Sequence, residues 1–433
     1  MSPTAVGLIG IAALFLFIFS RMPVGFVMAI IGFLGFGYLV SFDASMNLVA
    51  KDVFSVFGSY NLTVIPLFVL MGQIAYHSGI STRLFDAAYK FIGHLPGGLA
   101  IATIGACACF AAICGSTNAT AATMAAATLP EMKRYNYKPE LATGVVAAGG
   151  SLGILIPPSV IFIVYGIMTE QSIGKLFMAG LLPGLLLTVL FILTIVIWTS
   201  LNPELGPRGP RTTFKEKMTS LSGLVETLLL FLLVMGGLFI GFFTPTEAGA
   251  VGALGTLILA IARRNLTWHG FITSLFETTR ISCMILVIVA GATIFGHFLA
   301  ISRIPFDTAN WISGLQLPRY AIMLMIILLY LIGGCFIDAL ALIMLTVPIF
   351  YPVITHLGYD PLWFGVIIVL VTQIGVITPP VGTNVYVVSG VARDVPLNII
   401  FKGVVPLLIA LIIGTFILIP FPQIALFLPG LMK

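Results

Sequence analysis

The sequence predicts an all-α polytopic membrane protein with about ten transmembrane spans and two re-entrant helical hairpins. The first observation behind this prediction is composition. Of the 433 residues, 59% are apolar and 8% are charged, and the mean hydropathy is +1.15, whereas a soluble domain carries about 25% charged residues. The second observation is that the second half of the chain repeats the first at an offset of 218 to 224 residues. Composition therefore excludes a soluble globular protein. The net charge of +5 does not indicate nucleic-acid binding, because what matters in a membrane protein is on which side of the membrane the lysine and arginine residues lie.

The repeat is clearest where glycine or proline interrupts an apolar segment. Four pairs of segments match in order: GSTNATAA (115–122) with GCFIDALA (334–341), KPELATG (138–144) with DPLWFG (360–365), GILIPPS (153–159) with GVITPPV (375–381), and LFMAGLLPG (176–184) with IFKGVVP (400–406). In a membrane protein, broken segments at matching places in two halves indicate a transport site between inverted repeats. We therefore divide the chain into a first repeat, residues 1–212, and a second repeat, residues 213–433.

Ten apolar runs are long enough to cross a bilayer. In chain order they are 5–20, 24–42, 62–79, 139–169, 174–198, 218–243, 245–262, 280–300, 361–391 and 403–425. Proline pairs interrupt 139–169 and 361–391, which predicts two broken helices. Polar or glycine-containing clusters interrupt 97–130 and 319–350, and because each half is too short to span, each run predicts a re-entrant hairpin. Interfacial helices, or else ordinary loops, are predicted for three segments of mixed polarity: 48–58, 80–93 and 266–278.

The placement of lysine and arginine orients this arrangement. With the N-terminus outside and the spans alternating, 15 Lys and Arg residues fall inside and 5 fall outside, a positive-inside bias. Five spans in each half make the second repeat inverted and place both termini in the periplasm. The first hairpin is then expected to enter from the cytoplasm and the second from the periplasm.

The four breaks predict a polar site at membrane depth, because irregular backbone is tolerated there only when it lines a cavity or is buried in protein. The proline pairs 157–158 and 379–380 cannot donate to a helix, so carbonyls around 153–156 and 375–378 become free. Side-chain oxygens flank the breaks at Ser116, Thr117, Asn118, Thr120, Ser151, Ser159, Asp338, Thr372 and Thr378. Hard cations favour such oxygen ligands, and the free N–H groups of a helix start can hold an anion.

Two carboxylates have competing interpretations. Asp338 is the only carboxylate that the prediction places deep in the membrane, and it is either a ligand of an ion or substrate or a helix N-cap. Glu247, in the sequence Thr244-Pro245-Thr246-Glu247, fits a capping box and predicts a structural role.

The same motifs resemble the large membrane subunit of TRAP transporters, the tripartite ATP-independent periplasmic family. The segments that carry the resemblance are CGSTNATAA, LPEM, LGILIPPS, LFMAGLLPG, FFTPTEAGA, TVPIFYP and IGVITPPVGTNVYVVSG. The resemblance implies an elevator-type fold whose transport domain contains both hairpins and both broken helices. It further implies sodium-coupled uptake of an organic anion such as sialic acid or a C4-dicarboxylate across the bacterial inner membrane. The implied partners are a small four-span membrane subunit and a periplasmic binding protein.

The resemblance also implies two Na⁺ sites. One would use Ser116 and Asn118 with backbone near Gly150, Gly153 and Ile156. The second would use Gly334, Thr372, Gly375 and Thr378, with Asp338 nearby. The substrate would lie between the hairpin tips, with four candidate contacts: Ser116, Ser151, Ser159 and Asn384. The second tip departs from a Ser/Asn/Thr pattern at Cys335 and Phe336, so backbone carbonyls are expected to contribute more there.

Other functions make different predictions. A single-component sodium/carboxylate symporter of related architecture would work without a binding protein. A channel fits less well, because two hairpins favour occlusion over an open pore. A membrane enzyme fits least, because the sequence has no HExxH motif and no close pair of carboxylates within the predicted spans.

Overall fold

A computed structural model describes residues 1–20, 22–209, 212–314 and 317–432, and the elements found there are helices. The first half contains α1 (Pro3–Phe19), α2 (Val24–Leu39), α3 (Phe42–Phe57), η1 (Tyr60–Thr63), α4 (Val64–His77), α5 (Ile80–Ile92), α6 (Gly98–Cys114), α7 (Thr117–Arg134), α8 (Pro139–Ser151), η2 (Leu152–Ile154), α9 (Val160–Thr169), α10 (Ile173–Leu201) and η3 (Pro203–Leu205). The second half contains α11 (Phe214–Ile240), α12 (Pro245–Ala262), α13 (Trp268–Ile301), α14 (Ile304–Gly314), α15 (Arg319–Gly334), α16 (Ala339–His356), α17 (Pro361–Ile377), α18 (Thr383–Val391), α19 (Leu397–Leu418) and α20 (Gln423–Leu431).

The all-helical, multi-pass character of the prediction is confirmed. Within the described residues, six helices are long and apolar enough to cross a membrane, namely α10, α11, α12, α13, α16 and α19. A seventh span results if α3 and η1–α4, which meet at a bend of 48°, are counted as one. Each of the ten predicted spans contains a helix or a helix pair, but α1 and α2 have only 17 and 16 residues. A count of ten spans therefore stays a prediction.

Several predicted boundaries were wrong. The first hairpin continues beyond residue 130, because α7 runs to Arg134 past the internal Pro130. The second continues beyond residue 350, because α16 runs to His356 past Pro348 and Pro352. A separate interfacial helix at 266–278 does not form, since α13 is one continuous helix from Trp268 to Ile301. Its polar beginning contains Gly270, which does not end the helix, and no proline.

The broken helices have the predicted bounds. In the first, α8 begins at Pro139 and α9 ends at Thr169, with η2 and the proline pair between them. In the second, α17 begins at Pro361 and α18 ends at Val391. Proline has no backbone N–H to continue the hydrogen-bond ladder, so each helix stops before its proline pair.

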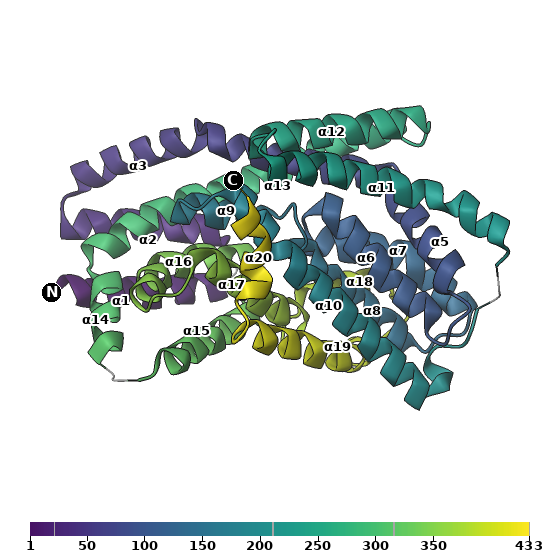
Figure 1. The fold of residues 1–433 in the computed structure, drawn as a ribbon. Helices are drawn as coiled ribbons and strands as arrows, with labels where there is room; N and C mark the ends of the chain where they lie inside the picture. Colours follow the sequence, from purple (N-terminus) through teal and green to yellow (C-terminus); the bar gives the residue numbers. More distant parts are fainter. Residues whose placement is uncertain (21, 210–211, 315–316, 433) are drawn as a thin grey trace.

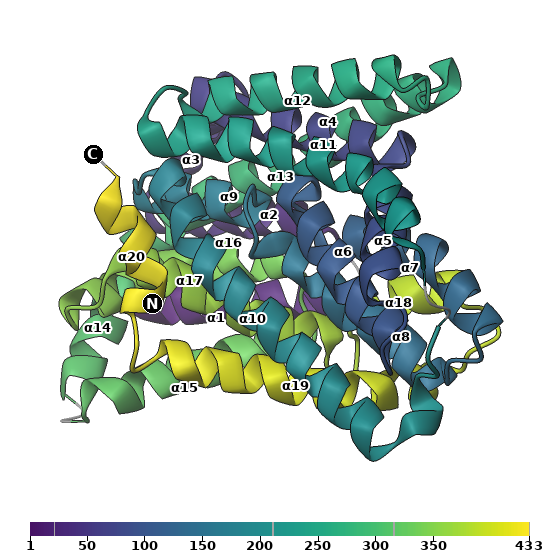
Figure 2. The ribbon, with the colours of Figure 1, turned by 45° about the vertical axis from the view of Figure 1, so that its right-hand side comes forward.

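The helices form a layer packed over a larger bundle. Helices α3, α4, α11, α12 and α13 lie along one side of the molecule, whereas α15 and α19 lie on the opposite side (Figures 1 and 2). Contacts of α4 with α12 and α13, and of α11 with α12, hold the layer together. Between these two sides lie α6 to α9 and α16 to α18, which contain the first hairpin and both proline breaks, and α10 runs from this middle region to the side of α19.

The two halves of the chain interlock inside this bundle. Helix α8 of the first half packs on α19 of the second, where a Cβ on Gly144 would overlap the backbone of Gly403 and a Cβ on Gly403 would overlap the backbone of Glu140. Lys402 Nζ lies 3.3 Å from Glu140 Oε2 at the same crossing. A second ion pair joins Lys133 at the end of α7 to Asp394 after α18 at 2.5 Å, and this lysine lowers the pKa of the Asp394 carboxyl.

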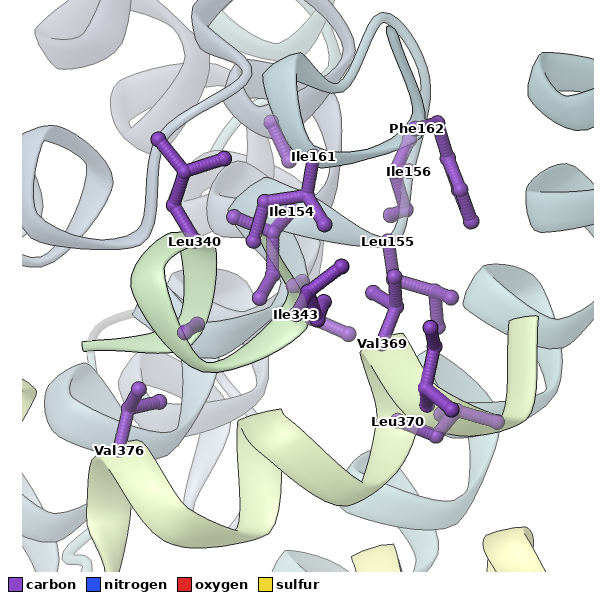
Figure 3. Packing of buried hydrophobic residues seen from close by; sticks show 14 of the residues in the cluster. Ile154, Leu155, Ile156, Ile161, Phe162, Leu340, Ile343, Val369, Leu370 and Val376 are labelled. Carbon is purple, nitrogen blue, oxygen red and sulfur yellow. The ribbon is translucent and has the colours of Figure 1, made fainter. Parts of the chain in front are cut away.

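Buried apolar side chains complete this junction around the first proline break. Ile154 and Ile161 lie beside Leu340 and Ile343 of α16, and Leu155 lies beside Leu370 of α17 (Figure 3). Because lipid tails are as apolar as these side chains, van der Waals packing rather than removal from water stabilises this contact. The break of one half is thereby fixed against the hairpin and broken helix of the other.

Candidate functional site

The first hairpin tip exposes the start of a helix. Helix α6 ends at Cys114, Gly115 adopts a left-handed conformation with φ of 64°, and α7 begins at Thr117. Ser116 is the N-cap, and its Oγ accepts a long hydrogen bond of 3.4 Å from the Ala119 N–H. The N–H groups of Thr117 and Asn118 have no hydrogen-bond partner in the described part of the chain, as is usual for the first turn of a helix. This tip therefore presents free donors.

The second hairpin tip differs in length and in charge. Four residues, Cys335 to Asp338, separate α15 from α16, compared with two in the first tip. Asp338 is the N-cap of α16, and its Oδ2 accepts a hydrogen bond of 3.0 Å from the Leu340 N–H. The N-cap interpretation of Asp338 is confirmed. Its side chain is nevertheless exposed rather than buried, so a further contact with a bound molecule is open to it.

Each tip lies against the proline break of its own half. A Cβ added to Gly153 would clash with the carbonyl of Ser116, and one added to Gly375 would lie 2.5 Å from the carbonyl oxygen of Gly334. Only glycine permits backbone to approach this closely. In the first half, Ser116 of the tip therefore lies against Gly153 of the break. In the second half, Gly334 of the tip lies against Gly375 of the break.

One cavity joins the two tips. Its volume is about 140 Å³, and three groups of residues line it: Cys114 to Ala119 from the first tip with Ile154, Val160 and Ile161; Asp338, Ala339 and Leu340 from the second tip; and Val69, Gly72, Gln73, Ile281, Met284 and Ile285 from α4 and α13. Asn118 and Asp338 are its exposed polar side chains, one from each tip. No lysine or arginine is among these lining residues.

The remaining residues predicted for Na⁺ surround the breaks. Thr372 Oγ1 donates to the Val369 carbonyl at 2.8 Å, and Thr378 Oγ1 donates to the Ile374 carbonyl at 2.6 Å. A hydroxyl that donates its proton keeps lone pairs that can coordinate a cation. Gly150 packs against Ala121 of α7, and Ile156 is buried beside its proline pair. Within the described residues, no cluster of three His, Cys, Asp or Glu side chains could hold a metal.

Three of the four predicted substrate contacts do not line the cavity. Ser151 is fully buried and donates to the Ala148 carbonyl at 2.7 Å. Ser159 is fully buried as the N-cap of α9. Asn384 is fully buried and donates to the Ala147 carbonyl at 3.0 Å, which ties α18 to α8. Only Ser116 of this set faces the cavity.

The sequence analysis missed the cavity wall that comes from α4 and α13. Gln73, Met284 and Ile285 lie in regular apolar helices without a break, so no local signal marked them. It also missed Gln373, which is fully buried on α17 and whose amide has no hydrogen-bond partner in the described part of the chain. A glutamine inside a predicted span is the signal that could have identified it.

The sequence of this chain matches a known protein family. Residues 11–424 match the family described as "Tripartite ATP-independent periplasmic transporter, DctM component". The chain belongs to this family. It is therefore a membrane component of an ATP-independent transporter, not an enzyme, and the tripartite description implies further components.

Individual DctM-family relatives cover nearly the whole chain. The C4-dicarboxylate TRAP transporter large permease DctM of Pseudomonas aeruginosa is 37% identical over 89% of this chain and 90% of its own length. The sialic acid large permease SiaM of Vibrio cholerae is 35% identical over 96% of each chain. The 2,3-diketo-L-gulonate large permease YiaN of Escherichia coli is 31% identical over 92% of this chain and 93% of its own length. Their substrates differ, although all are organic acids.

The DctM fold also resembles a solved transporter of low sequence similarity. The crystal structure of the Alcanivorax borkumensis YdaH transporter matches with a TM-score of 0.68 at 16% identity, over 91% of each chain. At this identity the likeness concerns the fold alone.

Proposed function

We propose that this chain is the large subunit of a sodium-coupled TRAP transporter that takes up an organic anion across the inner membrane. The cavity between the two hairpin tips is the observation that carries the proposal. It lies where free backbone N–H groups, side-chain oxygens of both tips and the first proline break meet, and a transport site of this kind is expected where two broken repeats face each other.

Two Na⁺ ions would bind at the tip–break contacts. In the first half, the Ser116 and Asn118 side chains would act with backbone carbonyls around Gly153. In the second, Thr372 and Thr378 would act with carbonyls of the Gly334–Gly375 contact. Sodium is a hard cation that suits such oxygen-only surroundings. Occupied cation sites would hold each tip against its break and so complete the cavity wall.

The anion would bind in the cavity with its acidic group at the start of α7. Free N–H groups and the helix dipole favour negative charge there, and Na⁺ nearby would add attraction. The relatives named for C4-dicarboxylates, sialic acid and 2,3-diketo-L-gulonate support an organic acid as the substrate class.

Transport would move this cavity across the membrane by an elevator motion. Residues 1–212 and 213–433 would form the inverted repeats, with both termini in the periplasm. The layer of α3, α4, α11, α12 and α13 would serve as the scaffold, and the interlocked hairpins and broken helices would move against it. A small four-span subunit and a periplasmic binding protein would complete the transporter.

Uptake by the reconstituted transporter tests the sodium coupling. We expect a sigmoidal dependence on sodium concentration and no uptake when a proton gradient is supplied in choline buffer. Thr372→Val should shift the sodium response to higher concentration, because it removes a predicted ligand oxygen. Thr415→Val removes a buried hydroxyl of α19 that donates to Leu411 and should leave the sodium response unchanged. Full uptake in sodium-free buffer would contradict the proposal.

A further inference from the structure

A groove between α10 and α19 shares no lining residue with the cavity between the hairpin tips. Six residues of α10, from Leu190 to Leu201, and four of α19, from Pro406 to Ile413, line its volume of about 420 Å³. None of these lining residues is charged, and the hydroxyl of Thr194 donates within its own helix to the Leu190 carbonyl at 2.8 Å. The groove joins the two halves of the chain, because α10 belongs to the first half and α19 to the second (Figure 2).

One end of this α10–α19 groove leads to a lysine. A Cβ on Gly414 would lie 3.2 Å from the side chain of Leu190, so the two helices run in opposite directions and Pro406 lies at the same end as Leu201. Lys402 is one turn before Pro406 on the same face of α19. Its side chain is 75% exposed. The apolar groove is therefore followed by an accessible ammonium group.

Basic side chains outnumber acidic ones at this end of the groove. The Lys138 N–H at the start of α8 donates to the Leu205 carbonyl just beyond α10 at 3.0 Å, and the Lys138 side chain is exposed. Lys402 Nζ lies 3.3 Å from Glu140 Oε2 of the same α8. The segments 138–140, 202–208 and 402 carry three basic and two acidic residues: Lys138, Arg208 and Lys402 against Glu140 and Glu204. An excess of positive charge beside an apolar membrane surface attracts anionic lipids.

The length of the groove matches one leaflet of a bilayer. Leu201 follows Leu190 by eleven residues, which is about 16 Å of helix, whereas the hydrocarbon core of a bilayer is about 30 Å thick. A transmembrane helix of a partner would need the whole thickness, but an acyl chain of one leaflet needs half of it. Trp198 lines the groove one turn before α10 ends, as is typical of indole rings at the membrane–water interface.

We propose that the α10–α19 groove binds an anionic phospholipid, with an acyl chain between the two helices and the phosphate at Lys402. In the predicted orientation this end of the groove is cytoplasmic, so the lipid comes from the cytoplasmic leaflet. It contacts a helix from each half of the chain and holds the two halves together. The proposal concerns neither the substrate nor sodium, so it stands or falls independently of the proposed function.

The fluorescence of Trp198 tests the proposal, because bromine on an acyl chain quenches an indole that it contacts. The full chain is reconstituted in phosphatidylcholine vesicles that contain a minor fraction of brominated phosphatidylglycerol or brominated phosphatidylcholine. Trp268 and Trp311, which are 77% and 61% exposed, are replaced by phenylalanine, and Trp363, at 2% exposed, adds only a constant signal. We expect the anionic lipid to bind at Trp198 about fivefold more tightly, as the attraction of one lysine allows.

Lys402→Gln should remove this fivefold preference, because it removes the ammonium group and keeps a polar side chain of similar length. Lys133→Gln is the matched control. Lys133 is also exposed and also pairs with a carboxylate, that of Asp394 at 2.5 Å, and it lies on the same predicted side of the membrane. It does not line the groove, so its replacement should leave the preference at about fivefold.

Thr194→Phe tests the place of the acyl chain, because the larger side chain fills the groove. The preference for the anionic lipid should be lost in this variant, since the phosphate is held only when a chain lies between the helices. Val189→Phe adds the same ring on the same helix at a position that is 52% exposed and does not line the groove. This control should retain the preference.

Three results would overturn the proposal. The first is equal quenching by the two brominated lipids in the chain with Lys402 and Thr194 intact. The second is an equal loss of preference in Lys402→Gln and Lys133→Gln, which would show that the charge of the whole face attracts the lipid without a site. The third is a Trp198 that neither lipid quenches, which would show that protein covers the groove, and a dimeric mass of the reconstituted chain would then assign it to a second copy.

Discussion

The backbone of Gly375 on α17 lies directly against the backbone of Gly334 at the end of α15. A Cβ on Gly375 would be 2.5 Å from the Gly334 carbonyl oxygen, a distance that real Cβ contacts do not reach. The first half has the same relationship between Gly153 and Ser116. In both halves a glycine just before the proline pair lets a hairpin tip approach the break, so the carbonyls of both segments gather in one place.

Gly375→Ala should therefore separate the second tip from its break. Overpacking of this kind costs about 1–3 kcal/mol, and we expect a lower melting temperature together with a weaker sodium response of uptake. Gly390→Ala is the control, because Gly390 lies on the other arm of the same broken helix and a Cβ there meets no atom within 4 Å. Equal melting temperatures and equal sodium responses for the two variants would show that the close approach is unimportant.

Asp338→Ala should impair uptake far more than Glu247→Ala at equal expression. Asp338 caps α16 and faces the cavity, so its removal affects the bound molecule as well as the helix. Glu247 completes a capping box with Thr244, accepting from the Thr244 N–H at 2.8 Å on an exposed surface. The loss of Glu247 should lower thermal stability slightly and leave the apparent affinity for substrate unchanged. Comparable uptake by the two variants would refute a role for Asp338 beyond capping.

Glu226→Leu should destabilise the junction of α5, α11 and α12. The Glu226 side chain is 8% exposed and pairs with Arg83 at 3.4 Å and with Arg263. Removing one partner of a fully buried pair costs about 3–5 kcal/mol, and the partial exposure of both arginines should reduce that cost. Thermal unfolding measures the effect. Glu277→Leu is the control, since Glu277 meets Arg280 at 3.7 Å on an exposed helix surface and should leave the melting temperature unchanged.

The parts of the site that the sequence could predict are those with a local cause. Two adjacent prolines at 157–158 supply no N–H to a helix, and Gly115 is followed directly by the N-cap residue Ser116, so both breaks were found at the right residues. The wall contributed by Gln73 and Met284 depends on how α4 and α13 pack against a tip distant in sequence. Burial of Ser151 and Asn384 likewise follows from the crossing of α8 with α18. Contacts between segments that are distant in sequence produce no local pattern in the amino-acid sequence of a single chain.

Two cysteine positions test the predicted topology. Lys138 lies in the loop between α7 and α8, and His356 ends α16 before the loop to α17. Both side chains are exposed. The substitutions Lys138→Cys and His356→Cys are made in a Cys283→Ser background, because Cys283 is the native cysteine with an exposed side chain.

The cysteine at position 138 should react with an impermeant thiol reagent only from the cytoplasm, and the cysteine at position 356 only from the periplasm. The reason is that the first loop region carries Lys133, Arg134 and Lys138, whereas residues 352–360 carry neither lysine nor arginine. The two loops occupy the same place in the two repeats, so labelling from opposite sides requires inverted repeats. Labelling of both positions from one side would make the repeats parallel. Both hairpins would then enter from the same face, and a single cavity opened alternately to the two sides of the membrane could not be formed by their tips.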